Sequence, residues 1–285
     1  IELPLVVIDV QRGGPSTGLP TKPEQSDLLF AMFGRHGEAP LPVVAISCPS
    51  DAFETTIEAC RIALKYMTPV ILLSDNNVAN GSEPWMLPDV DSLPDLKPDF
   101  ITEPNGEDGT FLPYKRDAET FARPWAIPGT PGLEHRVGGL EKNEITGNVS
   151  YVPSNHQAMT DVRAWKVANI AHDIPPLEVD DPDGADVLVL GWGSSFPPIK
   201  AAVNVLRKTG TKVAQAHLRH LNPFPANLAE VLDQYDKVLV PELNTGQLRF
   251  LLRAEFLREI EGLNKVDATP FKVEEIASKI QELTA

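Results

Sequence analysis

A glycine-rich polar run follows the first apolar segment of the chain, and its residue types suit the binding of a small anion. The apolar segment covers residues 3–10 and is typical of a buried strand. Arg12 comes directly after it and offers a planar set of donors that matches a carboxylate. The glycines of the run let the backbone approach a ligand closely, and three hydroxyls add short donors: Ser16, Thr17 and Thr21. We therefore predict an anion-binding loop, with a solvated glycine/proline turn as the alternative.

The elements around this loop place it at one edge of a parallel sheet. The apolar patterns predict strands at 3–10, 42–48 and 70–73, and helices at 24–34 and 51–67. Strands that alternate with helices form parallel sheets, whose ligands bind beyond the carboxyl ends of the strands. Arg12 and Asp75 both follow the end of a predicted strand, so we expect them at the same edge.

The same alternation returns in the second half of the chain, after a long stretch without it. Residues 80–160 are rich in proline and acidic residues, which predicts an extended connection that wraps over a neighbouring surface. The later patterns predict strands at 187–190, 212–216 and 237–240, and helices at 160–171, 197–208, 226–234, 246–260 and 273–283. We therefore expect an α/β fold with two parallel-sheet units, residues 1–82 and 181–285, joined by a wrapping segment, residues 83–180.

The composition limits the classes of function. The 285 residues are 42% hydrophobic and 23% charged, which is ordinary for a globular protein. A formal net charge of −15 disfavours binding to nucleic acids and to anionic lipid. No apolar run approaches the roughly 20 residues that span a bilayer. Cys48 and Cys60 are expected to be buried thiols, and this low cysteine content, with no signal peptide, predicts a cytoplasmic location.

Other candidate motifs are weaker. The turn at 191–195, Gly-Trp-Gly-Ser-Ser, lacks the third glycine and the later acidic residue of a dinucleotide site. The residues at 242–244 follow a predicted strand and suit either an interface or a helix cap. No two histidines have the spacing of a metal site on one helix. His217 and His220 are interpreted as ordinary core or surface residues, whereas His36 precedes a glycine and could contact a substrate or a partner subunit.

Several strings of the sequence resemble the alpha subunit of 2-oxoacid:ferredoxin oxidoreductases, and the 2-oxoglutarate type most closely. The first and most specific is QRGGPSTGLPTKPEQSDL at residues 11–28. The others follow in the order of that family: PSDAFET at 49–55, MTPVILLSD at 67–75, HRVGGLE at 135–141, NH at 155–156, NPFP at 222–225 and ELNTGQL at 242–248. The resemblance covers nearly the whole chain. It also implies sequence upstream of Ile1, so we expect the chain to be a C-terminal portion of a longer polypeptide.

The resemblance implies a fold and a reaction. The first unit would be the C-terminal part of the pyrimidine-type domain that binds thiamine diphosphate, and the last would resemble the C-terminal domain of transketolases. The reaction would be the oxidative decarboxylation of 2-oxoglutarate to succinyl-CoA, with coenzyme A as co-substrate and ferredoxin as electron acceptor. A beta subunit would hold the diphosphate with Mg²⁺ and a [4Fe–4S] cluster. Two cysteines cannot ligate such a cluster, which needs four.

The resemblance also assigns site residues. Arg12 would bind a substrate carboxylate, Thr21 would help to select the substrate, and Ser16 and Thr17 would shape the loop or contact the ligand. The glutamate that activates thiamine would lie upstream of this chain, so no catalytic residue is assigned here. Two alpha–beta pairs are the expected assembly. Two alternatives stay open: an enzyme of the same family that acts on pyruvate or another 2-oxoacid, and a non-catalytic transketolase-like scaffold subunit.

Overall fold

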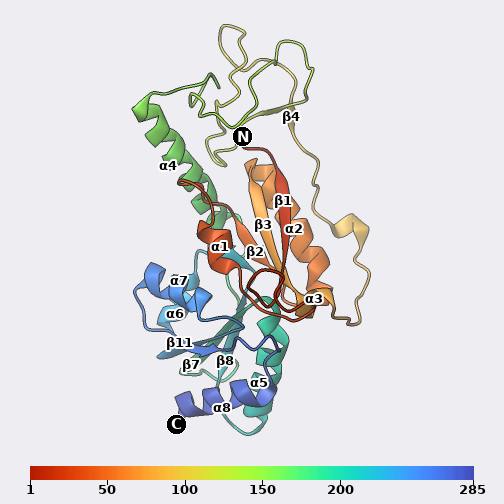
Figure 1. Ribbon diagram of the computed structural model, residues 1–285, viewed down its shortest axis with the longest axis vertical. Coiled ribbons are helices and arrows are strands. Elements are labelled where there is room, and N and C mark those ends of the chain that lie inside the picture. Colours follow the sequence, from red (N-terminus) through yellow and green to blue (C-terminus); the bar gives the residue numbers. More distant parts are fainter.

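The computed structural model describes all residues from 1 to 285 and confirms an α/β fold with two mainly parallel sheets, each with one antiparallel edge strand (Figure 1). The first sheet has the strand order β1-β3-β2-β9, with bounds Leu5–Gln11, Pro69–Asp75, Val43–Ala45 and His220–Asn222. The second has the order β11-β10-β7-β8-β6, with bounds Glu261–Asn264, Lys237–Glu242, Val187–Trp192, Ala214–Leu218 and Val179–Asp180. The pairs β1–β3, β2–β3, β7–β8, β7–β10 and β10–β11 are parallel.

Helices cover both sheets because apolar side chains alternate between the faces of each strand. In the first sheet, Val44 and Leu72 pack against α2 (Ala52–Tyr66), whereas Val43 and Leu73 face the opposite side. That opposite side is covered by α1 (Leu28–Phe33). The short helix α3 (Asn76–Ala79) follows β3 directly. In the second sheet, α5 (Phe196–Lys208) and α8 (Val273–Thr284) share one core cluster, and α6 (Leu228–Asp233) and α7 (Gln247–Phe256) share another.

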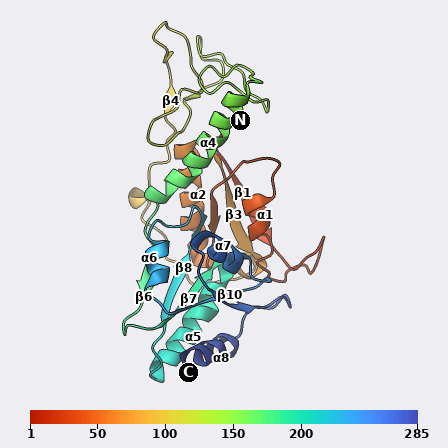
Figure 2. The same ribbon diagram turned by 90° about the vertical axis from the view of Figure 1, so that its left-hand side faces the viewer.

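The two sheets share one hydrophobic core. A cluster of 24 buried residues joins Leu28 and Leu73 of the first unit to Leu190 and Leu248 of the second. Strand β9, which comes from the second half of the chain, also pairs antiparallel with β2 in the first sheet. The two units are therefore packed as one body, stacked along the long axis of the molecule (Figures 1 and 2).

The proline-rich stretch contains little regular structure, as its composition predicts. Between α3 and α4 (Pro153–Asn169) lie only a short 3-10 turn, η2 (Val90–Ser92), and two paired dipeptide strands, β4 (Phe100–Ile101) and β5 (Trp125–Ala126). Its loops gather at the end of the molecule farthest from α8 (Figure 1). Helix α4 begins at Pro153, seven residues before the predicted start. Proline suits this position because the N–H group that it lacks would have no hydrogen-bond partner in the first turn of a helix. None of the helices has both the length and the apolar character needed to cross a membrane.

Several expectations about individual elements were wrong. Strand β1 is not buried: Leu5, Val7, Ile8 and Val10 are 44–58% exposed, because β1 is an edge strand that pairs only with β3. Cys48 and Cys60 are half-buried, not buried. The helix predicted at 246–260 ends at Phe256, where Leu257 adopts a left-handed conformation and turns the chain into β11.

The shared core generates a test of stability. Leu28 is fully buried in it, so Leu28→Ala should lower the free energy of unfolding by about 2–5 kcal/mol, through lost burial and the cavity left behind. Urea denaturation followed by tryptophan fluorescence measures this. The matched control is Leu87→Ala, where the side chain is 84% exposed and the change should stay within about 0.5 kcal/mol. Equal losses in the two variants would contradict a core shared by both sheets.

Candidate functional site

The loop after β1 lies at the carboxyl edge of the first sheet, as predicted. Gln11 at the end of β1 pairs in register with Asp75 at the end of β3, so Arg12 and Asp75 share this edge. Their environments differ, because Arg12 is exposed and Asp75 is 2% exposed. The Asp75 carboxylate caps α3 by accepting hydrogen bonds from two backbone N–H groups and accepts a third from the Ser194 hydroxyl. Burial nevertheless raises the pKa of Asp75.

The loop folds back on itself and contains strained backbone. The N–H of Gly13 donates to the carbonyl of Lys22 at 3.1 Å, and the N–H of Leu19 donates to the carbonyl of Gly13 at 2.7 Å. Ser16 and Thr21 have φ values of 58° and 66°, which are uncommon for residues other than glycine and especially for a β-branched residue. Strained residues of this kind gather at ligand sites because the surrounding structure must fix them.

A cavity of about 680 Å³ adjoins the loop. Arg12 and Ser16 line it from the loop, Asp9 lines it from β1, and residues 266–268, which follow β11, line it from the second unit. The structure therefore brings two of the four predicted site residues together. Thr17 and Thr21 are exposed on the same loop and do not line this cavity. The ligand contacts proposed for all four residues stay predictions.

Acidic side chains surround the single cation of this cavity. Arg12 is its only cationic lining residue, whereas four carboxylates line it: Asp9, Glu24, Asp27 and Asp267. Burial raises the pKa of Asp9, and the neighbouring Asp27 raises it further. Burial and Asp27 likewise raise the pKa of Glu24. The chain alone thus offers one strong donor for a carboxylate within an otherwise negative site.

This arrangement does not fit a diphosphate and its metal ion held by the chain alone. No group of three or more histidine, cysteine, aspartate or glutamate side chains is placed to bind a metal. Four carboxylates around one guanidinium would repel a diphosphate, whose binding normally uses several cations or backbone N–H groups. Positive charge for such a group must therefore come from outside these residues.

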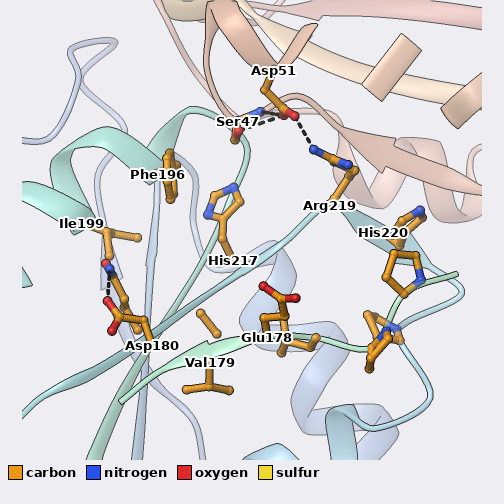
Figure 3. A pocket seen from close by; sticks show the side chains of 16 residues that line it. Ser47, Asp51, Glu178, Val179, Asp180, Phe196, Ile199, His217, Arg219 and His220 are labelled. Carbon is orange, nitrogen blue, oxygen red and sulfur yellow. Dashed lines mark hydrogen bonds and ion pairs between the residues drawn. The ribbon is translucent and has the colours of Figure 1, made fainter. Parts of the chain in front are cut away.

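A second cavity, of about 520 Å³, lies between the first and second units (Figure 3). Ser47 and Asp51 line it from the segment that follows β2, and His217 lines it from β8. Arg219, directly after β8, also lines it and is ion-paired to Asp51. The Nε2 atom of His217 is buried without a hydrogen-bond partner, and burial lowers the pKa of His217 to about 4, so its ring is neutral at pH 7. Sequence reasoning missed this cavity, because its walls come from distant segments that carry no common motif.

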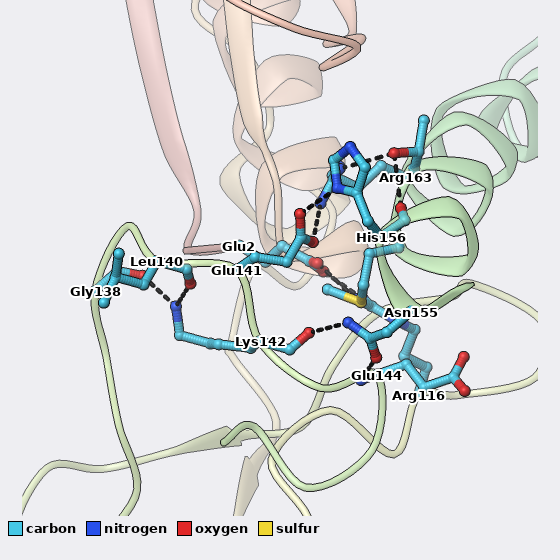
Figure 4. Close-up of polar contacts among 12 residues, drawn as sticks. Glu2, Arg116, Gly138, Leu140, Glu141, Lys142, Glu144, Asn155, His156 and Arg163 are labelled. Atoms are coloured by element: carbon cyan, nitrogen blue, oxygen red, sulfur yellow. Dashed lines mark hydrogen bonds and ion pairs between the residues drawn. The ribbon is translucent and has the colours of Figure 1, made fainter. Parts of the chain in front are cut away.

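The other histidines are mostly structural. His220 is 5% exposed, and its Nε2 lies 3.0 Å from a carboxylate oxygen of Glu58 on α2, which confirms a core role. His156 on α4 pairs with Glu141, which also contacts Arg163 at 3.4 Å (Figure 4). His36 is exposed, and its contact with a substrate or partner stays a prediction.

Two of the later strings lie together and fasten the wrapping segment to α4 (Figure 4). Asn155 is 8% exposed, donates to the carbonyl of Lys142 at 2.9 Å and accepts from the N–H of Glu144 at 2.9 Å. At the neighbouring end of the segment, Glu2 is ion-paired with Arg116 and with Lys166 of α4. These residues hold the loops in place and show no arrangement suited to catalysis.

Two family models match the chain. The model described as pyruvate flavodoxin/ferredoxin oxidoreductase, thiamine diphosphate-binding, matches residues 1–151. The model described as pyruvate:ferredoxin oxidoreductase core domain II matches residues 185–276. The first includes the loop of Arg12, and the second includes the glycine turn at 191–195.

Individual relatives agree with these matches. The chain is 57% identical over 285 residues to the 2-oxoglutarate oxidoreductase subunit KorA of Mycobacterium tuberculosis, which covers 100% of this chain and 43% of that protein. It is 29% identical over 288 residues to the 2-oxoglutarate synthase subunit KorA of Methanothermobacter marburgensis, covering 98% of this chain and 73% of that protein. A solved structure of 2-oxoglutarate:ferredoxin oxidoreductase from Magnetococcus marinus, with 2-oxoglutarate, coenzyme A and succinyl-CoA bound, has a TM-score of 0.89 and 34% identity.

The match to that structure covers 100% of this chain and 49% of the other. The chain therefore spans less than half the length of two of these three proteins.

The acidic cavity generates a test by titration. Asp27 contributes to the raised pKa of both Asp9 and Glu24, so Asp27→Asn should lower both values toward their ordinary 3.8 and 4.5. Carboxyl ¹³C NMR over a pH series measures both groups. Asp267→Asn removes a carboxylate that lines the same cavity but contributes to neither shift, so it should leave them unchanged. Unaltered titrations in Asp27→Asn would contradict the proximity of these carboxylates.

Proposed function

Because this chain belongs to the family of pyruvate flavodoxin/ferredoxin oxidoreductases, we propose that it forms part of the alpha subunit of a 2-oxoglutarate:ferredoxin oxidoreductase. The observation that carries the proposal is the 57% identity, along the whole chain, to a subunit named for 2-oxoglutarate. The position of Arg12 at the carboxyl edge of a parallel sheet supports it. We propose the units 1–82 and 181–285, joined in the chain by the wrapping segment 83–180, as the domains of this part.

The proposed reaction converts 2-oxoglutarate, coenzyme A and two oxidised ferredoxins into succinyl-CoA, CO₂, one proton and two reduced ferredoxins. Thiamine diphosphate, when bound, would stabilise the carbanion left by the loss of CO₂. The task of Arg12 in this scheme is to hold a substrate carboxylate through paired N–H donors. A fixed pose matters because decarboxylation needs the breaking bond to be aligned with the group that accepts its electrons.

We propose that a beta subunit completes the site. The acidic lining around Arg12 and the lack of a metal-binding cluster support the placement of the diphosphate and Mg²⁺ on another chain. The two cysteines of this chain support the same placement for a [4Fe–4S] cluster. Ser16 and Thr17 would shape the loop or contact the ligand, and Thr21 would help to select the substrate. Two alpha–beta pairs and a cytoplasmic location stay predictions.

The choice of substrate is tested by turnover. The full-length alpha subunit, co-purified with its beta partner, is assayed with coenzyme A, ferredoxin and a panel of 2-oxoacids: 2-oxoglutarate, pyruvate and a branched-chain oxoacid. We expect kcat/KM to be highest for 2-oxoglutarate by at least about tenfold, which corresponds to about 1.4 kcal/mol of transition-state binding. A preference for pyruvate would support the related enzyme instead, and no turnover with any oxoacid would support a scaffold subunit.

The role of Arg12 is tested in the same complex. Lysine keeps the charge but loses the planar pair of donors, so Arg12→Lys should lower kcat/KM for 2-oxoglutarate by about tenfold or more, since a hydrogen bond to a charged group contributes about 1.5–3 kcal/mol. Arg253→Lys is the matched control, because Arg253 is exposed on α7 and its side chain makes no hydrogen bond or ion pair in the structure. Wild-type kinetics in Arg12→Lys would rule out substrate binding by this side chain.

A further inference from the structure

A buried glutamine joins the candidate loop to the second sheet. Gln25 is 0% exposed, and its side-chain Nε2 donates to the carbonyl of Trp192 at 2.8 Å. Its Oε1 accepts from the N–H of Leu243 at 2.9 Å, and its own N–H donates to the carbonyl of Leu243 at 2.9 Å. Its carbonyl accepts from Nδ2 of Asn244 at 2.8 Å. Every polar group of Gln25 is therefore satisfied by Trp192 at the end of β7 and by residues 243–244, which directly follow β10.

The turn that receives this side chain is the glycine-rich one at 191–195. Gly193 has a φ of 56°, and a Cβ atom at this position would lie 2.8 Å from Nε2 of Gln25. Its neighbours Trp192, Ser194 and Ser195 are at most 2% exposed. The space that a nucleotide phosphate would need is thus filled by the amide of Gln25, which agrees with the expectation that this turn is structural.

A buried carboxylate holds the other side of this contact. Glu242 at the end of β10 is 0% exposed, and burial raises the pKa of its carboxyl group. It accepts hydrogen bonds from Nε1 of Trp192 at 3.2 Å and from Nδ2 of Asn244 at 3.1 Å. The N-terminus of α7 donates two more, from the N–H groups of Leu248 and Arg249. Trp192 and Asn244, which form hydrogen bonds with Gln25, are therefore held in place by Glu242.

Buried glutamines hold both ends of the loop by hydrogen bonds: Gln25 at its C-terminal end and Gln11 at its N-terminal end. Gln11, 2% exposed, donates to the carbonyl of Ser74 at 3.0 Å and accepts from the N–H of Asp27 at 3.0 Å. Between these two anchors the backbone–backbone hydrogen bonds all lie within the loop, including the one from Gly13 to Lys22, and the Arg12 carbonyl accepts a hydrogen bond from Oγ of Ser26 at 3.4 Å. A displacement of Gln25 would therefore move Lys22, and through the hydrogen bond between Lys22 and Gly13 it would also move the adjacent Arg12.

We propose that Gln25 is a positioning residue, which docks the substrate loop on the glycine turn of the second sheet and so sets the direction of the Arg12 guanidinium. Gln25 does not reach the cavity of Arg12 and would touch no substrate. The inference rests on the proposed function only for its kinetic consequence. Its structural part, an ordered loop that depends on this amide, stands or falls separately.

The first experiment replaces the amide with a near-isosteric group. In Gln25→Glu, a carboxylate oxygen would face the carbonyl of Trp192 in place of a donor, so the contact becomes repulsive. In the complex of full-length alpha subunit with its beta partner, we expect KM for 2-oxoglutarate to rise about tenfold or more, with kcat changing less. A loss of folded enzyme would lower apparent kcat and leave KM unchanged. Gln281→Glu, an exposed glutamine on α8, is the matched control.

Hydrogen exchange on the same complexes reports the loop without any substrate. The amides of Gly13, Leu19 and Lys22 should exchange about tenfold faster in Gln25→Glu than in the wild type or in Gln281→Glu. Faster exchange in Gln25→Glu, together with a wild-type complex that turns over no 2-oxoacid, would uphold the docking contact and refute the proposed function. Unchanged exchange together with unchanged KM would overturn the inference, whatever the substrate.

A second variant approaches the contact from the other side and covers the case in which Gln25→Glu fails to fold. Gly193→Ala places a methyl group against Nε2 of Gln25, whereas Gly184→Ala adds one at a similar φ of 64° with open space around it. Only Gly193→Ala should raise KM and loop exchange. Combined with Gln25→Glu, it should add little, because both remove the same contact. Equal effects of the two glycine variants would show that backbone strain alone is responsible and would overturn the inference.

Discussion

Two mainly parallel sheets meet in this protein through the carboxyl ends of their strands, and the buried side chains of Gln25, Asp75 and Glu242 at that junction all have hydrogen-bond partners. The end of β3 reaches the turn after β7 through Asp75 and Ser194, and the segment after the loop reaches the same turn through Gln25. A buried backbone or side-chain group without a partner would cost about 1–3 kcal/mol. The fixed relation between the sheets therefore follows from hydrogen-bond satisfaction as much as from the apolar cluster they share.

This junction also explains how an exposed loop can be ordered. The loop of Arg12 has few apolar contacts of its own, and several of its residues adopt strained backbone conformations. Its two ends, however, are held by buried glutamines on a rigid frame. A binding loop with this design can present polar side chains to a ligand or to another subunit without losing its shape.

Much of the fold could be predicted from apolar periodicity. Helices α2, α5 and α8 lie within a residue or two of their predicted bounds, because one apolar stripe on each faces a sheet. Strands β6, β9 and β11 were missed, since they are two to four residues long and depend on pairing with distant segments. The exposure of β1 was missed for a related reason: apolar composition identifies a strand and does not say whether neighbours cover it.

The candidate site was only partly visible in the sequence. Arg12 could be found because an arginine among glycines and hydroxyl groups is poor packing material, and its position at the sheet edge followed from the strand pattern. The approach of Asp267 to this cavity could not be predicted, because Asp267 follows β11 in the second sheet and is distant from Arg12 in the sequence. Gln25 gave no signal at all, since its partners lie 167 and 218 residues away.

The open flank of β1 has a practical consequence for anyone who produces this chain by itself. Its outer edge carries a row of unpaired N–H and C=O groups beside four partly uncovered aliphatic side chains. Bare edges of that kind recruit strands from other molecules and seed aggregates. The yield of unaggregated protein will therefore depend more on co-producing a chain that covers this edge of β1 than on the buffer chosen afterwards.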